Sequence, residues 1–176
     1  MGTDLARDSE LFEAAMAAAL DDGCAGDVIV AQSERERAAI WSMRDASADL
    51  ARAFSPHVDY DVSLPVGTIG DFAVECRRRL LESWPQGDVV CFGHVADGNL
   101  HVSAQIREGV RTKDDTDRIV YGCVAQWQGS VSAEHGIGLL KKAYLGYSRN
   151  EAELALMKRL KEALDPKGIL NPGKVF

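Results

Sequence analysis

The chain alternates between two hydrophobic periods, one typical of helices and one typical of strands. Helical patterns cover residues 8–22, 33–54, 68–84, 112–128, 138–143 and 150–164, and strand patterns cover residues 27–31, 58–64 and 130–134. Residues 88–107 predict a hairpin, and the Pro- and Gly-rich tail from 165 to 176 predicts irregular structure. Because the one direct strand–strand connection is a hairpin, the pattern favours an α+β fold with an antiparallel sheet and helices on one face.

Three residues stand where helices are expected to begin and carry side chains that can cap backbone N–H groups. Ser33 and Asn150 are each followed three residues later by Glu, which predicts capping boxes. Thr68 is expected to cap the next helix. That helix has a predicted buried stripe at i, i+4 and i+8, formed by Phe72, Cys76 and Leu80.

The segment 93–101 holds two of the chain's four histidines around an Asp-Gly turn signal. A two-residue turn at Asp97-Gly98 would pair His94 with His101, with their Cβ atoms roughly 4.5–5.5 Å apart on one face. The other face would then be apolar and face the core, through Val89, Cys91, Val95, Leu100, Val102, Ala104 and Ile106. The alternative is a pair of half-exposed histidines beside a turn.

Composition places the chain among water-soluble globular domains. Its 176 residues, 46% hydrophobic and 27% charged, suit a single domain over residues 1–176. A net charge of −7 argues against a general nucleic-acid binder, and no apolar run approaches the roughly 20 residues that a membrane span needs. The four cysteines form no CxxC pair and no secretory signal precedes them, which predicts reduced thiols and a cytoplasmic location.

A second signal, Glu134-His135 before Gly136, changes the interpretation of the two hairpin histidines. His94, His101 and Glu134 together offer two imidazoles and one carboxylate, the composition of a catalytic metal site with open positions. Zinc, manganese and iron(II) all accept such ligands. His135 is then left as a general base, since histidine titrates near neutrality. The alternative is that His135 is itself a ligand or supports one.

Five stretches together resemble the C-terminal part of the FAD-linked oxidase family, which includes D-lactate, glycolate and D-2-hydroxyglutarate dehydrogenases. They are Trp41-Ser-Met-Arg44, Asp61-Val-Ser-Leu-Pro65, Gly93 to His101, Ser132-Ala-Glu-His-Gly136 and Leu164 to Lys174. The resemblance implies a ferredoxin-like cap domain that closes over a flavin held by a separate FAD-binding domain. It implies that His94, His101 and Glu134 hold a divalent ion, with zinc or manganese expected.

The resemblance also implies roles for three further residues. His135 would be the catalytic base, Arg44 would bind the substrate carboxylate, and Asn171 would lie near the flavin. The reaction would oxidise a small 2-hydroxy acid to the 2-oxo acid and pass electrons to an acceptor that the sequence does not identify. The resemblance places the FAD-binding domain outside these 176 residues, and we expect it to be supplied in cis or in trans. We therefore expect a fragment that is inactive alone, and the sequence leaves a homodimer open.

Two positions depart from the 2-hydroxyglutarate members of the family. Many of these carry lysine where this chain has Asp59 and asparagine where it has Ser103. Because an acid repels a second substrate carboxylate, we expect a monocarboxylic 2-hydroxy acid. Two other functions stay open at this point. They are a non-catalytic fragment that binds a metal or a partner chain, and a flavin-free metal hydrolase.

Overall fold

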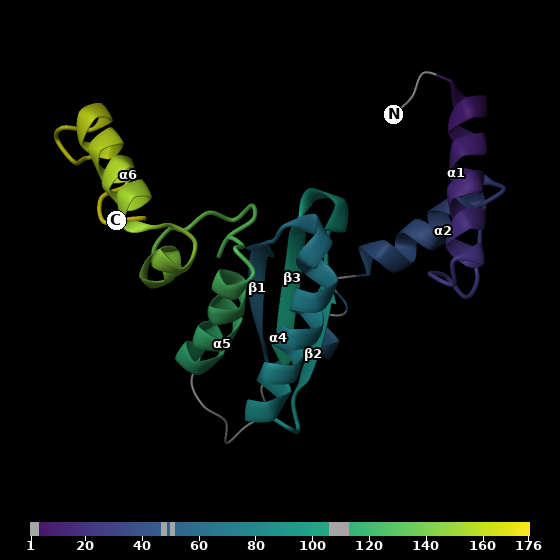
Figure 1. Ribbon diagram of the computed structural model, residues 1–176, viewed down its shortest axis with the longest axis horizontal. Coiled ribbons are helices and arrows are strands. Elements are labelled where there is room, and N and C mark those ends of the chain that lie inside the picture. Colours follow the sequence, from purple (N-terminus) through teal and green to yellow (C-terminus); the bar gives the residue numbers. More distant parts are fainter. Residues whose placement is uncertain (1–3, 47–48, 50–51, 106–112) are drawn as a thin grey trace. The chain divides into compact units, whose positions relative to one another are not determined.

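The computed structural model describes residues 4–46, 49, 52–105 and 113–176 (Figure 1). Its contacts divide the chain into two units, Met1–Leu50 and Ala51–Phe176, and each is described by itself. The first unit contains α1 (Leu5–Asp21) and α2 (Glu34–Asp45), and neither helix has a buried residue. Both begin at a side-chain cap, because Asp4 accepts from the Arg7 N–H and Ser33 accepts from the Glu36 N–H.

One prediction for this first unit is wrong, and a second is correct in part. Residues 27–31 form no strand, and Ile29 is 81% exposed, because within the described residues no strand pairs with this short apolar run. The helix expected over 33–54 ends at Asp45 as α2, and residues 49, 52 and 53 are again helical. Residues 47, 48, 50 and 51 lie outside the described part of the chain.

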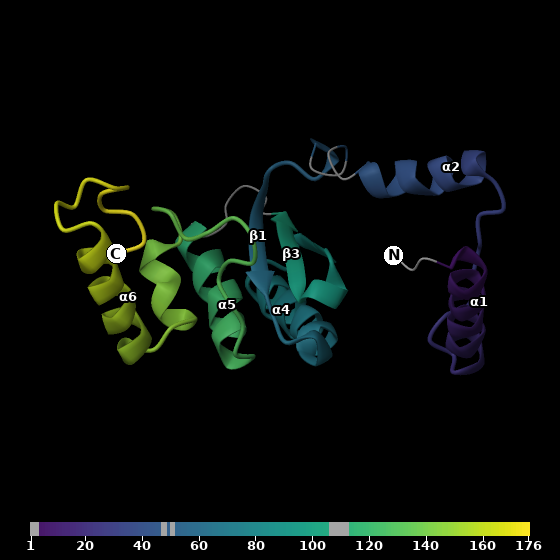
Figure 2. The ribbon, with the colours of Figure 1, turned by 90° about the horizontal axis from the view of Figure 1, so that it is seen from above.

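The second unit is built on a three-stranded antiparallel sheet with strand order β1-β3-β2. The strands are β1 (His57–Ser63), β2 (Asp88–Phe92) and β3 (Asn99–Gln105). Two helices, α4 (Ile69–Ser83) and α5 (Lys113–Gln126), cover one face of this sheet (Figures 1 and 2). The predicted α+β class, the antiparallel sheet and the placement of helices on one face are therefore confirmed.

The core lies between that face of the sheet and the two helices. Alternate strand residues point into it, and they include Tyr60, Val62, Leu100, Val102 and Ala104. The predicted stripe of α4 meets them, with Phe72 and Cys76 fully buried and Leu80 1% exposed. Burying one such large apolar side chain stabilises the fold by about 1.5–3 kcal/mol. This face of the sheet therefore forms part of the hydrophobic core.

The predicted pairing of the hairpin is wrong by two residues. His101 lies opposite Phe92, and the chain then passes through a short 3₁₀ helix, η2 (Val95–Asp97), instead of a two-residue turn. Gly98 ends η2 with φ +73°, and its carbonyl accepts from the Leu64 N–H at 2.9 Å. This hydrogen bond joins the connection to Leu64, the residue directly after β1.

A slip of two residues keeps every strand residue on its predicted face, since side chains alternate with a period of two. Val89, Leu100, Val102 and Ala104 are accordingly buried as expected. Val95, which the shorter turn placed in the core, is 50% exposed. Ile106 lies outside the described residues.

The chain after α5 is mostly irregular until the last helix. The strand expected over 130–134 is reduced to one isolated bridge between Ser63 and Ser130, on the open side of β1. A 3₁₀ helix, η3 (Lys142–Tyr147), follows, and then α6 (Glu151–Leu164). Asn150 and Glu153 form the predicted capping box of α6, whereas Thr68 makes no side-chain cap and donates to the Pro65 carbonyl instead.

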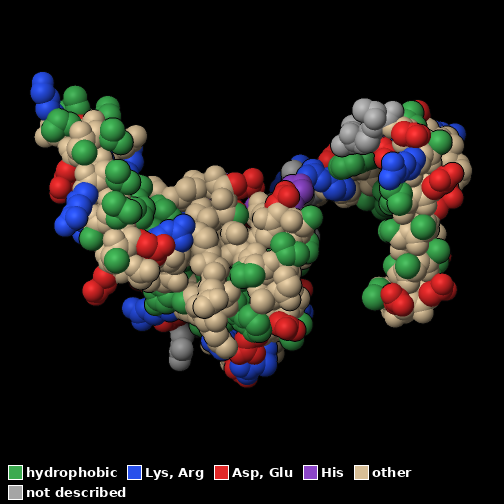
Figure 3. Space-filling view, turned by 45° about the horizontal axis from the view of Figure 1, so that its top comes forward, with side chains coloured by type: hydrophobic (Ala, Val, Ile, Leu, Met, Phe, Trp, Pro, Cys, Tyr) green, Lys and Arg blue, Asp and Glu red, His purple; other side chains and the backbone are tan. Residues whose placement is uncertain are grey.

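The tail after α6 returns toward the loop that follows α5. The Val175 N–H donates to the Gly138 carbonyl at 3.0 Å, and Lys142 Nζ donates to the Gly173 carbonyl at 3.0 Å. Hydrophobic side chains of α6 are exposed, among them Leu156, Leu160 and Leu164. Figure 3 shows green, hydrophobic atoms on the surface of the part of the chain that contains α6. Within the described ranges, no helix is long and apolar enough to cross a membrane.

Candidate metal and substrate site

The face of the sheet opposite the helices carries polar side chains where β1 and β3 run side by side. Asp61 pairs directly with His101, and Asp59 pairs with Ser103 two residues further along. Directly paired residues of antiparallel strands project on the same face with Cβ atoms about 4.5–5.5 Å apart. The register therefore places a carboxylate next to the imidazole of His101.

A loop is wrapped around the Asp61 side chain and forms the rest of the site. The Oδ2 atom of Asp61 accepts from the backbone N–H groups of Ala133, Glu134 and His135 at 3.2, 3.1 and 3.0 Å. The Ser132 hydroxyl donates to the same oxygen at 3.1 Å. These bonds bring the predicted Glu134-His135 pair to the polar face of the sheet.

The same contacts stabilise the ionised form of the Asp61 side chain. Burial by itself raises the pKa of Asp61, but hydrogen bonds from the N–H groups of His135 and Glu134, and the positive charge of Lys141, outweigh it. The pKa of Asp61 is therefore below its ordinary value, and the side chain is a buried carboxylate anion at neutral pH.

Three side chains come close enough to share a metal ion. The ligand atoms of Asp61, His101 and Glu134 lie within 4.8 Å of one another, and His101 Nε2 is 3.7 Å from Glu134 Oε1. Within the described residues, the Oδ1 atom of Asp61 is buried and has no hydrogen-bond partner. An unpartnered buried carboxylate oxygen is costly, and a cation would satisfy it. One imidazole and two carboxylates fit a divalent ion such as zinc or manganese.

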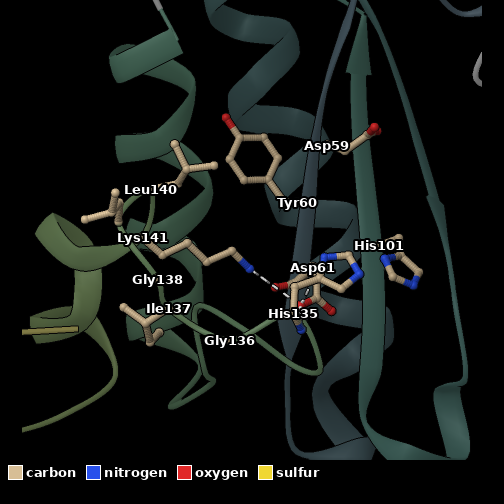
Figure 4. Close-up of a pocket in the computed structure, with 11 residues that line it drawn as sticks. Asp59, Tyr60, Asp61, His101, His135, Gly136, Ile137, Gly138, Leu140 and Lys141 are labelled. Carbon is tan, nitrogen blue, oxygen red and sulfur yellow. Dashed lines mark hydrogen bonds and ion pairs between the residues drawn. The ribbon is translucent and has the colours of Figure 1, made fainter. Parts of the chain in front are cut away.

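His135 lies beside this cluster. Its Nδ1 atom is 3.7 Å from Asp61 Oδ2, and the centres of the His101 and His135 rings are 6.1 Å apart (Figure 4). The next residue, Gly136, has φ +73°, a conformation that glycine adopts without strain. The chain can therefore turn sharply after His135 and leave its imidazole 65% exposed.

A pocket of about 360 Å³ opens beside these residues (Figure 4). Its polar lining is formed by Asp59, Asp61, His101, His135 and Lys141. Its apolar lining is formed mainly by Ile137, Leu139 and Leu140. A pocket with convergent polar groups on one side and apolar groups on the other suits a small organic acid.

The structure does not bring every predicted site residue into this cluster. His94 is exposed on the connection before η2 and is not among the three clustered donors. Asn171 is exposed in the tail, with φ +47°, and its side-chain oxygen accepts from Lys174 Nζ at 3.4 Å. Arg44 lies on α2 in the first unit, where it pairs with Asp45 at 3.1 Å. The functional roles of His94, Asn171 and Arg44 stay predictions.

Two residues of the site were not predicted to take part in it. Asp61 occupies an alternate, polar position of a strand that was predicted, so its face could have been read from the period of two. The pairing of Asp61 with His101 could not have been predicted, because it depends on how two strands that are far apart in the sequence pair. Lys141 carries no local signal, since lysines on surface helices and loops are common.

Comparison with known proteins agrees with the resemblance drawn from the motifs. Residues 1–175 match the profile of the family described as "FAD linked oxidases, C-terminal domain", and the chain therefore belongs to that family. The curated relatives it resembles are dehydrogenases of 2-hydroxy acids, as the following three show.

A D-2-hydroxyglutarate dehydrogenase of Xanthomonas citri pv. viticola is 35% identical over 184 residues, covering 99% of this chain and 39% of the relative. A provisionally named mitochondrial D-lactate dehydrogenase of Schizosaccharomyces pombe is 37% identical, covering 98% of this chain and 35% of the relative. A mitochondrial D-2-hydroxyglutarate dehydrogenase of Arabidopsis thaliana is 34% identical, covering 99% of this chain and 31% of the relative. The chain thus spans between 31% and 39% of the length of these relatives.

Proposed function

We propose that this chain is the substrate- and metal-binding domain of a flavin-dependent dehydrogenase that oxidises a 2-hydroxy acid to the 2-oxo acid. The observation that carries the proposal is the clustering of Asp61, His101 and Glu134 next to a pocket that Asp61, His101 and His135 line. It occurs in a chain whose family is defined by FAD-linked oxidases. Neither the donor set nor the family alone would identify the reaction.

The donor set defines the kind of metal that the chain would hold. His101, Glu134 and Asp61 would bind zinc or manganese through one imidazole and two carboxylates. His94 is a further candidate ligand. A divalent ion there would stabilise negative charge on the substrate oxygen and so favour loss of the hydroxyl proton. With these protein ligands, the ion would still be able to bind the hydroxyl and carboxylate oxygens of a 2-hydroxy acid.

The chain's own residues would manage the proton and the orientation of the substrate. His135 would accept the hydroxyl proton of the substrate, while Arg44 would bind its carboxylate through a guanidinium fork. FAD would be bound mainly by a separate domain, with Asn171 near it, and would be the oxidant that accepts a hydride from the carbinol carbon. Loss of one proton to His135 and one hydride to the flavin would convert the carbinol to the carbonyl of the 2-oxo acid, which balances the reaction. The final electron acceptor is a separate partner.

Asp59 supports a monocarboxylic substrate. Its Oδ1 atom accepts from the Ser103 hydroxyl at 2.5 Å, and its Oδ2 atom lies 3.0 Å from His57 Nε2. These two contacts hold a carboxylate at the pocket that Asp59 lines. A substrate with a second carboxylate would meet this negative charge, whereas D-lactate would not.

Four further predictions belong to the same proposal. The order β1-α4-β2-β3-α5, with a single bridge on the open side of β1, supports a ferredoxin-like arrangement. The apolar surface of α6 supports docking of a further domain or a second copy as a homodimer. A single functional domain over residues 1–176 and a cytoplasmic location also remain part of the proposal.

The proposal is tested by metal content first and by turnover second. Elemental analysis of the purified chain should find about one equivalent of zinc or manganese, which is lost in His101→Ala and Glu134→Gln. The chain alone should not reduce a dye with D-lactate, and adding the FAD-binding domain of a close relative should restore reduction. Metal-dependent ester hydrolysis without flavin would support the hydrolase instead. Metal binding without turnover under any of these conditions would support a non-catalytic fragment.

A further inference from the structure

Lys141 carries a charge that is largely removed from solvent, and the proposed reaction gives this residue no role. Its side chain is 14% exposed, and that of Asp61 is 2% exposed. Lys141 Nζ donates to the backbone carbonyl of Asp61 at 2.9 Å and to the Ser132 hydroxyl oxygen at 3.1 Å. It also lies 3.5 Å from Asp61 Oδ2, which Figure 4 shows as a dashed line. One ammonium group therefore ties the edge strand β1 to the loop after α5.

Asp61 makes the complementary contacts from the strand side. Its Oδ2 atom accepts from three consecutive backbone N–H groups, of which the last two belong to Glu134 and His135. Those are the residues proposed as metal ligand and base. Because backbone N–H groups fix the path of the chain, they also fix where the two side chains leave it.

We propose that Asp61 and Lys141 form a positioning pair that holds the Ser132–His135 loop so that Glu134 and His135 face His101. The inference rests on the proposed function in one respect, since the metal ion is what a correctly held Glu134 would bind. Hydrogen bonds from backbone N–H groups to an ionised carboxylate are roughly twice as strong as those to a neutral acceptor. A neutral side chain at position 61 would therefore hold the loop less firmly.

The chain contains a second arrangement of the same kind, which serves as a matched control. Asp165 follows α6, its side chain is 4% exposed, and it pairs with Lys161 at 2.5 Å. Its carboxylate accepts from the Ile169 and Leu170 N–H groups at 3.0 and 2.9 Å. Like Asp61, Asp165 is thus a buried acid that contacts a lysine and accepts hydrogen bonds from backbone N–H groups. Unlike Asp61, it does not line the pocket.

The test compares Asp61→Asn with Asp165→Asn in the full chain. Zn²⁺ and Mn²⁺ affinities are measured by calorimetry, and exchange of the Ala133, Glu134 and His135 amides is measured by NMR in the metal-free chain. We expect Asp61→Asn to weaken metal binding by about 10- to 100-fold. It should also expose the three amides to faster exchange. Because Asp61 is itself one of the three clustered donors, the loss of metal affinity supports positioning only together with the amide exchange of the metal-free chain. Asp165→Asn should change neither readout, although it too removes a buried carboxylate charge.

Ser132→Ala keeps the test decisive if Asp61→Asn does not fold. This change removes one donor to Asp61 Oδ2 and one acceptor from Lys141, while both Asp61 oxygens stay in place. We expect faster exchange of the three amides and a several-fold loss of metal affinity. Unchanged exchange of the three amides in either folded variant would overturn the proposal, whether or not the metal affinity changes.

The exchange measurement also separates this inference from the proposed function. If the wild-type chain binds no metal but Asp61→Asn still loosens the loop, the positioning pair stands and the metal site fails. If metal binds in both proteins and the amides stay protected, the metal site stands and the positioning pair fails.

Discussion

The two faces of the sheet use the same three strands for opposite purposes. On one face, Tyr60, Val62 and Val102 are at most 1% exposed and pack against α4 and α5. On the other face, Asp61 and His101 pair across the strands and take part in the polar cluster. Successive residues of a strand therefore divide between packing and chemistry, and the period of two makes the division possible.

Burial alone does not distinguish these faces. Asp61 is 3% exposed, comparable to core residues, but the loop from Ser132 to His135 covers it through hydrogen bonds. Core residues need neighbours of suitable volume, whereas Asp61 needs particular donors in particular directions. We therefore expect substitutions on the core face to change stability, and substitutions on the polar face to change ligand binding.

The largest effect is expected from Phe72→Ala in the core. Phe72 is fully buried between α4 and the sheet, so its removal should lower the free energy of unfolding by about 3–5 kcal/mol. Urea unfolding followed by circular dichroism measures this loss. Val74→Ala on the same helix is the control, because Val74 is 71% exposed and should cost less than about 0.5 kcal/mol. Equal losses in the two variants would mean that this face is not the core.

The next largest effect is the stabilisation of the chain by its metal. An ion that binds only the folded state should add about 2.7 kcal/mol to the free energy of unfolding when its free concentration is 100 times Kd. His101→Ala should abolish this gain while changing the metal-free chain little, since the His101 side chain lies at the polar face. Unfolding with added Zn²⁺, before and after a chelator, provides the measurement. A similar gain in the variant would contradict a site on this face.

A smaller effect is expected from His94→Ala. His94 is exposed on the connection before η2, so it would have to be brought to the ion by movement of that connection. Because that movement offsets part of the binding energy, we expect about a tenfold loss of Zn²⁺ affinity, less than for His101→Ala. Calorimetry on the two variants gives the order directly. Unchanged affinity in His94→Ala would leave Asp61, His101 and Glu134 as the protein ligands.

The core face could be predicted from the sequence more completely than the polar face. The stripe of Phe72, Cys76 and Leu80 follows from the helical period alone, and all three are buried. The hairpin faces were also correct although the register was not, because the slip was by two residues. Hydrophobic patterns thus specify which side of an element is inside without specifying which residue it meets.

The polar cluster needed information that local patterns do not contain. His94 was expected opposite His101 because an Asp-Gly pair is typical of a two-residue turn, but the contact between Gly98 and Leu64 draws the connection elsewhere. Asp61 and the loop that it holds are separated by more than 70 residues. Such a contact depends on the assembled fold. Glu134 and His135 were predicted from their residue types and from the motif shared with the family, and not from the contacts that place them.

The smallest effect is expected at the edge of the polar face, where Asp59 lines the pocket. One extra negative charge near a substrate carboxylate costs on the order of 1 kcal/mol close to a protein surface, which corresponds to about a fivefold change in affinity. The metal-loaded chain should therefore bind D-lactate more tightly than D-2-hydroxyglutarate. Asp59→Asn should reduce the ratio of the two affinities about fivefold, because it should improve binding of the dicarboxylate.

Asp88→Asn provides the matched control for Asp59→Asn, measured by the same calorimetric titrations. Asp88 is also an acid on a strand, with its side chain 53% exposed against 62% for Asp59, but it does not line the pocket. Its removal lowers the net negative charge equally, so any general charge effect would appear in both variants. If the preference for D-lactate over D-2-hydroxyglutarate changes only in Asp59→Asn, the polar face is the part of the protein that discriminates between the two acids. If the wild-type chain binds both acids equally, selection against a second carboxylate does not occur here, and Asp59 only orients Ser103 and His57.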